Sequence, residues 1–379
     1  MKIVSAKAEY IRYQSRMVRD GEGHSHPGKP HEAKVGFLTI VCDDGTEGHA
    51  VDGNMLVDVL NRVVAPAIIG EDPFMHEHIW QRMRTWQRLH SDFTDRTLCA
   101  LDLALWDICG KKCGVPVYKL LGGYKDKVPA YGSIMVGDDI KGGLDTPEAY
   151  AEFAKKLVAK GYKAIKLHTW MPPIIPNPDP KLDVKACQMV RDAVGPDIAL
   201  MLDPYHDYTR EQALYIADAL YELGFLWMEE PMDEHSMSSY VWLNSHTRLP
   251  ICGPETVEGK NRTRADWIAA GASDIGRAGT EVTGGITSVM KSAHLYESFG
   301  MNIELHGNTI GNLHVLGAIP NGEYFERGLL HPLLDYETPK PWFKSIYDPM
   351  DENGFVSIPS VPGLGWDFDY DYIKDNIVV

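Results

Sequence analysis

The 379-residue sequence predicts an α/β protein: a modified (β/α)8 TIM barrel preceded by an α+β capping domain. Two observations carry this prediction. From about residue 129 onward, short apolar runs alternate with amphipathic helical segments, as is typical of parallel βαβ units. Within that stretch, acidic residues end three apolar runs at equal steps of 26 residues: Asp203, Glu229 and Glu255. Acidic strand ends in phase indicate one repeated architectural unit.

The capping domain is expected over residues 1–128. Apolar alternation predicts strands over 3–13 and 35–41, with a polar loop over 15–34 between them. Helical spacing of apolar residues then predicts helices at 55–69, 76–89 and 94–113. The last helix should end at residues 114–116, Gly-Val-Pro.

The barrel is expected over residues 129–340, because eight strand signals follow one another there with helical segments between them. They lie around Tyr131 and at residues 162–167, 198–202, 225–228, 249–253, 274–276, 301–305 and 324–326. The remaining segment, 341–379, lacks this alternation and is expected to pack back on the capping domain.

Composition and charge narrow the partners and the compartment. The chain carries 37 Lys and Arg against 53 Asp and Glu, a net charge of −16, which repels nucleic acid and anionic membranes. No apolar run approaches the roughly 20 residues of a membrane span, and the first residues lack the apolar core of a signal peptide. Six scattered cysteines suit a reducing compartment. We therefore expect a cytoplasmic protein with no nucleic-acid or membrane partner.

The strand ends carry the candidate chemistry, because barrel enzymes place their active sites at the carboxyl ends of the strands. Asp203, Glu229 and Glu255 would offer three hard oxygen donors, which suit a hard cation such as Mg²⁺. The other strand ends are also charged or titratable: Lys166, His168, Asp274, His306 and Glu326.

Each of these residues has an expected role. Lys166 and His168 alternate along a strand and so share a face, where each positive group would ease loss of the proton from the other. Asp274, one strand before His306, would fix the tautomer of that histidine as in a dyad. Glu326, if protonated by burial, would donate a hydrogen bond to substrate; a salt bridge with Arg327 or another cation is the alternative.

Four segments give the chain a family resemblance. They are residues 100–107 (Ala-Leu-Asp-Leu-Ala-Leu-Trp-Asp), 119–123 (Lys-Leu-Leu-Gly-Gly), 227–231 (Trp-Met-Glu-Glu-Pro), and the Thr-Gly-Gly turn at 283–285 after Asp274. The chain resembles the enolase superfamily, mandelate racemase subgroup, over nearly its whole length.

The resemblance implies a function for the same residues. Asp203, Glu229 and Glu255 match the Mg²⁺ ligands, and His306 with Asp274 matches the His-Asp base. Lys166 matches the first lysine of a Lys-x-Lys motif. His168 stands where the family usually has a second lysine, the proton-abstracting base; it could be the base itself or bind substrate.

The resemblance also implies abstraction of the proton α to a carboxylate. Capping-domain loops should then lie over the site, and they offer polar groups: Arg19, His24, His26 and Asn54. His206, shortly after Asp203, joins them as a hydrogen-bonding candidate. Such groups suit a hydroxylated substrate, so we expect an acid-sugar dehydratase acting on an aldonate or aldarate. Racemisation, epimerisation and cycloisomerisation share the first step and stay open. Relatives of this kind are usually homo-oligomers.

Two hypotheses from other functional classes compete with the dehydratase hypothesis. His24 and His26 form the His-x-His pattern of zinc-dependent barrel hydrolases, but here the pattern lies in a polar loop outside the barrel. The chain could also be a catalytically silent ligand-binding relative, although the full set of candidate ligands and bases argues against that.

Overall fold

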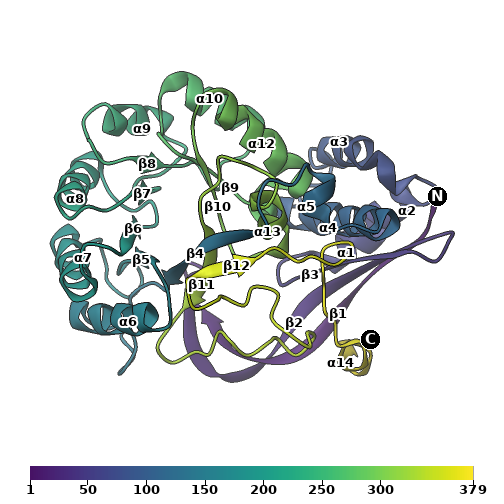
Figure 1. Cartoon of the computed structure of the whole chain (residues 1–379), viewed down its shortest axis with the longest axis horizontal. Helices are drawn as coiled ribbons and strands as arrows, with labels where there is room; N and C mark the ends of the chain where they lie inside the picture. The colour runs from purple at the N-terminus through teal and green to yellow at the C-terminus, as the bar shows by residue number, and fades with distance from the viewer. Residues whose placement is uncertain (379) are drawn as a thin grey trace.

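The computed structural model describes residues 1–378 and has two parts, a capping domain and a barrel with parallel strands (Figure 1). The capping sheet has the order β13-β1-β2-β3, from β1 (Ile3–Arg19), β2 (Ser25–Cys42), β3 (Glu47–Asp52) and β13 (Ile377–Val378). Beside it lie α1 (Val57–Val59), the π-helical η1 (Leu60–Val64), α2 (Ala65–Ile68), the 3-10 turn η2 (Pro73–Met75), α3 (His76–Trp86), α4 (Asp95–Cys113) and α5 (Val117–Leu120).

Helix α4 is the apolar centre of the capping domain. Thr94 caps its start by accepting a hydrogen bond from the Thr97 N–H, and Gly114 ends it with a φ of 69°, a left-handed conformation that favours glycine. Its apolar residues pack with the capping sheet and with barrel helix α12 (Ile286–Ser298) in one continuous core. The capping domain is therefore fixed on the barrel by shared burial.

The predicted polar loop over residues 15–34 is wrong. Strands β1 and β2 pair antiparallel almost to their tips, from Ile3 opposite Cys42 to Arg19 opposite Ser25, and only residues 20–24 form a turn. The polar residues misled the prediction because both faces of this part of the hairpin are largely solvent-exposed, so its strands need no apolar alternation.

The barrel confirms the predicted fold class, with eight strands in the predicted order. They are β4 (Lys127–Ile134), β5 (Ala164–His168), β6 (Ala199–Asp203), β7 (Met228–Glu229), β8 (Ile251–Cys252), β9 (Gly276–Ala278), β10 (Ile303–Leu305) and β11 (Phe325–Leu330). The helices between them lie outside the strands: α6 (Pro147–Ala159), α7 (Pro180–Val194), α8 (Arg210–Glu222), α9 (Met237–Asn244), α10 (Asn261–Ala270), α11 (Thr280–Thr283), α12 and α13 (Ile310–Leu316) (Figure 1).

The strands follow one another around the ring. Strands β11, β4, β5, β6, β7 and β8 form one ladder in that order, and β9 pairs with β10 in a second. A parallel bridge between Cys252 and Ile275 joins the two ladders. On the other side, the Glu304 carboxylate in β10 accepts hydrogen bonds from the backbone just before β11. The carboxyl ends of all eight strands consequently face the same side.

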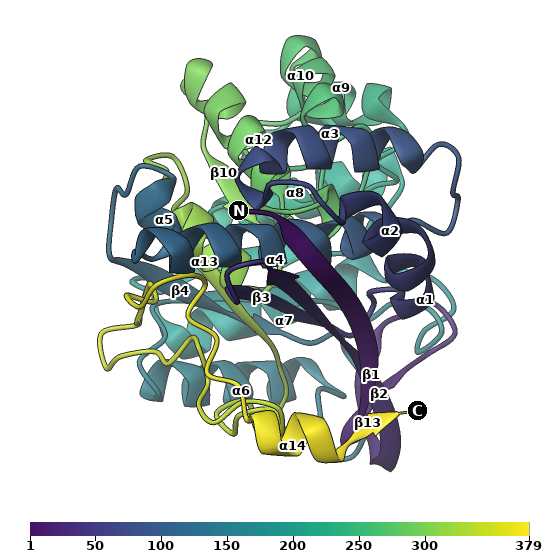
Figure 2. The ribbon, with the colours of Figure 1, turned by 90° about the vertical axis from the view of Figure 1, so that its right-hand side faces the viewer.

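The C-terminal segment contacts both parts. Strand β12 (Phe355–Ser357) pairs with β4, and α14 (Tyr370–Asp375) leads into β13, which pairs with β1 (Figure 2). Trp342, Phe368 and Ile373 are buried against the capping sheet. Among residues 1–378, none of the helices combines the length and apolar character that a membrane span needs.

Candidate active site at the carboxyl ends of the barrel strands

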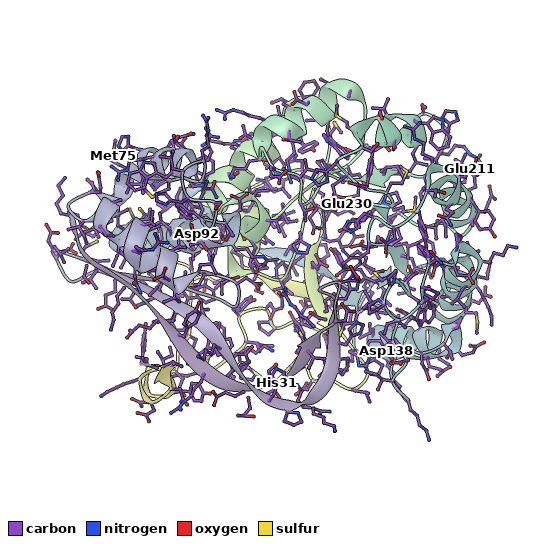
Figure 3. The ribbon with its side chains drawn as sticks, turned by 180° about the vertical axis from the view of Figure 1, so that it is seen from behind. His31, Met75, Asp92, Asp138, Glu211 and Glu230 are labelled. Atoms are coloured by element: carbon purple, nitrogen blue, oxygen red, sulfur yellow. The ribbon has the colours of Figure 1, made fainter. Side chains whose placement is uncertain are left out.

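Three carboxylates stand in a row across neighbouring strands. Asp203 ends β6, Glu229 ends β7, and Glu255 lies shortly after β8. Glu230, the residue after Glu229, contacts the backbone of Glu255: its Oε1 accepts a hydrogen bond from the Glu255 N–H at 2.6 Å. Figure 3 shows Glu230 inside the ring of barrel helices. The Glu229 side chain is 1% exposed, against 14% for Asp203 and 12% for Glu255, so the row opens to solvent at its two ends.

Two permanent cations lie between these carboxylates. Nζ of Lys166 is 3.1 Å from Oδ2 of Asp203 and 3.0 Å from Oε1 of Glu229. Nη2 of Arg277 is 2.8 Å from the same Glu229 oxygen, and its Nε is 3.2 Å from Oε2 of Glu255. Both cations also contact Glu326, at 3.2 Å from Lys166 and 2.9 Å from Arg277.

The charges of this cluster do not balance. When all four carboxyls are ionised, they face two cations, which leaves an excess of two negative charges in a buried place. Burial raises the pKa of Glu229 to about 8 even though Arg277 and Lys166 oppose the shift, so this carboxyl keeps a proton near neutral pH unless further positive charge is supplied. A divalent cation supplies the missing charge, and carboxylate oxygens are the donors that Mg²⁺ prefers.

The row is spread more widely than a closed metal site. Within residues 1–378, the oxygens of Asp203, Glu229 and Glu255 do not all lie within 4.8 Å of one another, because the two cations stand between them. Binding one ion therefore requires these side chains to close on it. In donor chemistry and in charge, the residues fit a divalent cation.

Lys166 is held as a cation. Burial would lower its pKa, but the carboxylates of Glu229 and Glu326 hold it well above the usual range. The sequence-based expectation that His168 would ease loss of the lysine proton is therefore wrong. In this arrangement Lys166 supplies positive charge.

His168 has the contacts of a base with a fixed tautomer. Its Nδ1 lies 2.5 Å from the carbonyl oxygen of Ile134, an acceptor only, so Nδ1 carries a proton. Its Nε2 points to Oδ2 of Asp203 at 3.1 Å, at one end of the carboxylate row. The ring is nearly buried, and Nε2 is the nitrogen that can take up a proton.

His306 stands at the other end of the row. Its Nδ1 lies 2.9 Å from Oε2 of Glu255 and 4.0 Å from Oε2 of Glu326. Burial alone would lower its pKa, but these two carboxylates outweigh burial and raise it. Its side chain is 29% exposed, so the ring is accessible to a substrate.

The predicted pairing of His306 with Asp274 is wrong. Asp274 precedes β9, is exposed, and accepts a hydrogen bond from the Ile251 N–H at the start of β8. It therefore lies at the amino end of its strand, away from His306. The prediction failed because the strand was placed two residues too early: Gly276–Ala278 is the strand, so the residue it presents to the site is Arg277.

The expected protonated state of Glu326 is also wrong, whereas its alternative, an ion pair with a nearby cation, describes the contact. Burial would raise its pKa, but Lys166 and Arg277 hold it well below the usual range. Glu326 is ionised and accepts a hydrogen bond from the Gly307 N–H at 2.8 Å, next to His306. Arg327 contacts Asp348 and Glu337 instead.

The expected substrate-binding residues lie in different places and differ in exposure. His24 and His26 lie buried at the hairpin tip, and the His24 ring meets Tyr205 edge-on at 4.6 Å between centroids. His206 is half-exposed and paired with Glu234. Asn54 lies just after β3. Arg19 is exposed, and it joins none of the ion pairs among residues 1–378. The structure thus brings His24 against Tyr205, and the substrate-binding roles of these residues stay predictions.

Sequence reasoning missed Arg277 and Tyr205. Tyr205 follows Asp203 by two residues, and its ring lies 5.3 Å from that of His168. It has a φ of 57°, an unusual value for a tyrosine, and the neighbouring His206 has 54°. A strained backbone at a strand end is common at functional sites. The only signal in the sequence was its position directly after an acidic strand end.

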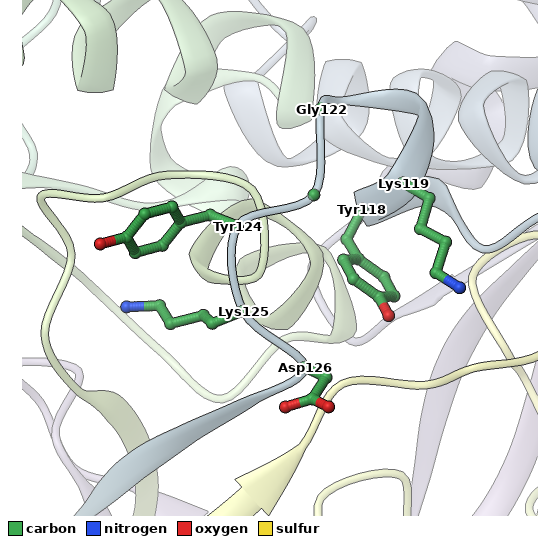
Figure 4. A pocket seen from close by; sticks show the side chains of 7 residues that line it. Tyr118, Lys119, Gly122, Tyr124, Lys125 and Asp126 are labelled. Atoms are coloured by element: carbon green, nitrogen blue, oxygen red, sulfur yellow. The ribbon is translucent and has the colours of Figure 1, made fainter.

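A separate surface pocket of about 450 Å³ lies among Tyr118, Lys119, Tyr124, Lys125 and Asp126 (Figure 4). These residues precede β4, so the pocket is at the amino-terminal side of the barrel. The catalytic cluster is at the opposite ends of the strands, and the pocket has no part in it.

Comparison with known families identifies both parts of the chain. Residues 24–122 match the mandelate racemase / muconate lactonizing enzyme N-terminal domain, and residues 149–372 match the enolase C-terminal domain-like family.

Several individual relatives are named as dehydratases or cycloisomerases of acid sugars. A crystal structure of D-glucarate dehydratase from Agrobacterium tumefaciens complexed with magnesium is 50% identical, has a TM-score of 0.97, and is matched over 100% of this chain and 99% of its own. Arabinonate dehydratase from Saccharolobus solfataricus is 30% identical over 89% of this chain and 88% of its own. D-Galactarolactone cycloisomerase from Agrobacterium fabrum is 29% identical over 89% of this chain and 90% of its own.

Proposed function

Because the chain belongs to the mandelate racemase / muconate lactonizing enzyme family of the enolase superfamily, we propose that it is a magnesium-dependent dehydratase of acid sugars. The observation that carries the proposal is the placing of two histidines at opposite ends of one carboxylate row. His168 contacts Asp203 at one end and His306 contacts Glu255 at the other. A proton can be removed at one end and delivered at the other.

Asp203, Glu229 and Glu255 would hold Mg²⁺, with Lys166 and Arg277 supplying the remaining positive charge. When bound, Mg²⁺ supplies charge that neutralises the substrate carboxylate and makes the neighbouring C–H more acidic. Lys166, held as a cation and 1% exposed, adds to the same field. A carboxylate substrate would thus lose its α-proton beside bound Mg²⁺ and the Lys166 cation.

His168 is the proposed base. Its Nδ1–H is fixed by the Ile134 carbonyl, so Nε2 can accept the α-proton of the substrate. His306 then donates a proton to the hydroxyl group on the β-carbon, and the C–O bond breaks with release of water. The enol left behind becomes a 2-keto-3-deoxy acid when it takes up a proton at the β-carbon and gives up the proton of its hydroxyl group. His168 gains one proton and His306 loses one in these steps, and proton exchange with solvent returns both rings to their starting state.

The substrate proposed is an aldarate of the D-glucarate type. The dehydratase from Agrobacterium tumefaciens supports it, because it is similar over the whole chain at 50% identity. Half-exposed His206, shortly after Asp203, supports a hydroxylated substrate, since a purely apolar surround would leave sugar hydroxyls unpaired. An aldonate is the neighbouring possibility, since other relatives are an arabinonate and a D-gluconate dehydratase.

A second candidate is cycloisomerisation of a sugar-acid lactone. The cycloisomerase relatives favour it, and the same two histidines would serve, with His306 donating to the ring oxygen that leaves. The product then keeps all atoms of the substrate, whereas dehydration loses one water. The masses of the products separate the two reactions.

The test is a panel of acid sugars and their lactones, incubated with the protein and Mg²⁺ and followed by 2-keto acid formation and by product mass. We expect a 2-keto-3-deoxy acid from at least one aldarate, with the highest kcat/KM on D-glucarate or a stereoisomer. Chelation of Mg²⁺ should abolish turnover. If no aldarate or aldonate in the panel loses water, the dehydratase proposal is wrong.

A further inference from the structure

The turn between β1 and β2 gathers three metal-binding side chains. Asp20, His24 and His26 each bring one donor atom within 4.8 Å of the others, and no other such group occurs among residues 1–378. Nε2 of His26 lies 2.7 Å from Oδ2 of Asp20, and Nδ1 of His24 lies 3.3 Å from the same oxygen. Two imidazole nitrogens and one carboxylate oxygen thus lie close together.

The turn fixes the Asp20 carboxylate for this purpose. Its Oδ1 accepts hydrogen bonds from the backbone N–H groups of Glu22 and His24, both at 3.0 Å. The backbone of Asp20 also closes the turn, with its N–H donating to the His24 carbonyl at 3.0 Å. One carboxylate oxygen therefore shapes the turn, and the other is left to face the two rings.

One donor atom at this point lacks a partner. Nδ1 of His24 is buried and, although 3.3 Å from Oδ2 of Asp20, forms no hydrogen bond with it or with any other group among residues 1–378. The His24 residue is only 8% exposed and His26 only 6%. A buried nitrogen without a partner destabilises the fold, so a ligand bound at this atom would remove that penalty.

The atoms suit a transition metal better than Mg²⁺. Ligand atoms about 2.0–2.2 Å from a tetrahedral zinc ion lie about 3.3–3.5 Å apart, close to the separation of His24 and Asp20. Imidazole nitrogen suits Zn²⁺ and its neighbours in the periodic table, whereas Mg²⁺ prefers oxygen. Three protein ligands leave a fourth position for water.

We propose that Asp20, His24 and His26 form a second metal site, for Zn²⁺ or a similar transition-metal ion, on the hairpin tip. Metal binding there would affect the active site, because the hairpin tip contacts a residue beside the proposed base. The His24 ring contacts Tyr205, and Tyr205 in turn lies against the base candidate His168. A metal ion that holds His24 fixes the tip against Tyr205 and so closes the capping side over the carboxylate row.

The test uses the full-length protein saturated with Mg²⁺, so that the carboxylate row is occupied, and Co²⁺ as the probe. Four-coordinate Co²⁺ with imidazole ligands absorbs visible light far more strongly than Co²⁺ surrounded by six oxygens. We expect one equivalent of Co²⁺ to produce the strong bands and Zn²⁺ to displace it. His26→Gln should weaken binding by about 10- to 100-fold or more, while leaving the backbone bonds of the turn intact.

The matched control is His31→Gln, an exposed histidine of the same hairpin whose Nδ1 faces only the Lys29 carbonyl (Figure 3). It should bind Co²⁺ as the unaltered protein does. Hydrogen exchange gives a second readout: Zn²⁺ should slow exchange at residues 18–27 in the unaltered protein and not in His26→Gln. Absence of strong bands, their persistence in His26→Gln, or their loss in His31→Gln would each overturn the proposal.

Discussion

Nδ1 of His306 lies 2.9 Å from Oε2 of Glu255, so the proposed general acid is bound to a proposed metal ligand. His306 has no carboxylate partner of its own at the strand before it. Gly279 occupies the place where a side chain could reach it, and a Cβ added there would meet the His306 carbonyl oxygen at 2.7 Å. The protonation state of His306 consequently depends on the charge of the carboxylate row.

The pairing predicts unequal effects of two acidic-to-amide substitutions. Glu255→Gln should lower kcat/KM on the aldarate substrate by about 10²- to 10⁴-fold, since it removes both a metal ligand and the partner of the acid. Asp274→Asn should change kcat/KM by no more than about twofold, because Asp274 lies at the other end of its strand. Steady-state kinetics on both variants checks this. Equal losses in the two variants would restore Asp274 as the histidine's partner.

Lys166 should matter for folding as well as for chemistry. Lys166→Met leaves Asp203 without its lysine partner and leaves Glu229 and Glu326 with Arg277 alone, which should lower the free energy of unfolding by about 3–5 kcal/mol in the absence of Mg²⁺. The control is Lys185→Met, an exposed lysine 3.3 Å from Glu148, which should cost under about 1 kcal/mol. Urea unfolding measures both. A stability of Lys166→Met equal to that of the control would show that the cluster is not charge-limited.

Arg277 should set how strongly the fold depends on the metal. Arg277→Met increases the excess negative charge of the carboxylate row, so Mg²⁺ should stabilise the variant more than it stabilises the unaltered protein. Chelation of Mg²⁺ should lower the Tm of Arg277→Met by several degrees more than it lowers the Tm of the unaltered protein. Arg248→Met removes an exposed ion pair with Glu222 and a cation–π contact with Tyr221, both outside the carboxylate row, and serves as the control. A Tm shift in Arg277→Met no larger than in the control would contradict the charge argument.

His314 should make the protein less stable in mild acid. Its Nδ1 accepts from the Tyr118 N–H and its Nε2–H donates to the Leu364 carbonyl, so the buried ring is neutral. Burial lowers its pKa to about 4, below the value of about 6.5 in the unfolded chain. Between these values the unfolded state binds more protons, so stability falls as pH falls.

The expected size of this effect is about 2 kcal/mol between pH 7 and pH 5. His314→Asn should be less stable at both pH values but should lose about 2 kcal/mol less on acidification. His246→Asn, at an exposed position, should keep the full acid sensitivity. Urea unfolding at the two pH values measures the difference. The same acid loss in His314→Asn as in the unaltered protein would exclude His314 as its source.

Local patterns were sufficient to predict the barrel, because each of its units buries an apolar strand between helices. Helix α4 was predicted to within a residue, since both its caps, Thr94 and Gly114, are visible in the sequence. The hairpin of β1 and β2 was not predicted beyond its buried parts. Its tip is held by antiparallel pairing and by Asp20, and neither leaves an apolar pattern.

The site shows the same division. The carboxylates were recognisable because Asp203 and Glu229 end apolar runs. Strand β9 is only three residues long, so placing it two residues too early presented Asp274 to the site in place of Arg277. The charge of Glu326 could not be foreseen either. It depends on Lys166 and Arg277, which come from other strands and meet Glu326 only in the folded barrel.

The most direct test of the account is the fate of the substrate α-proton in D₂O with Mg²⁺, followed by NMR on an aldarate that the protein dehydrates. His306→Asn should still exchange the α-proton for deuterium while forming little 2-keto acid, because the base acts without the acid. His168→Asn should lose both exchange and product. Exchange that persists in His168→Asn but disappears in His306→Asn would contradict the assignment of the two histidines.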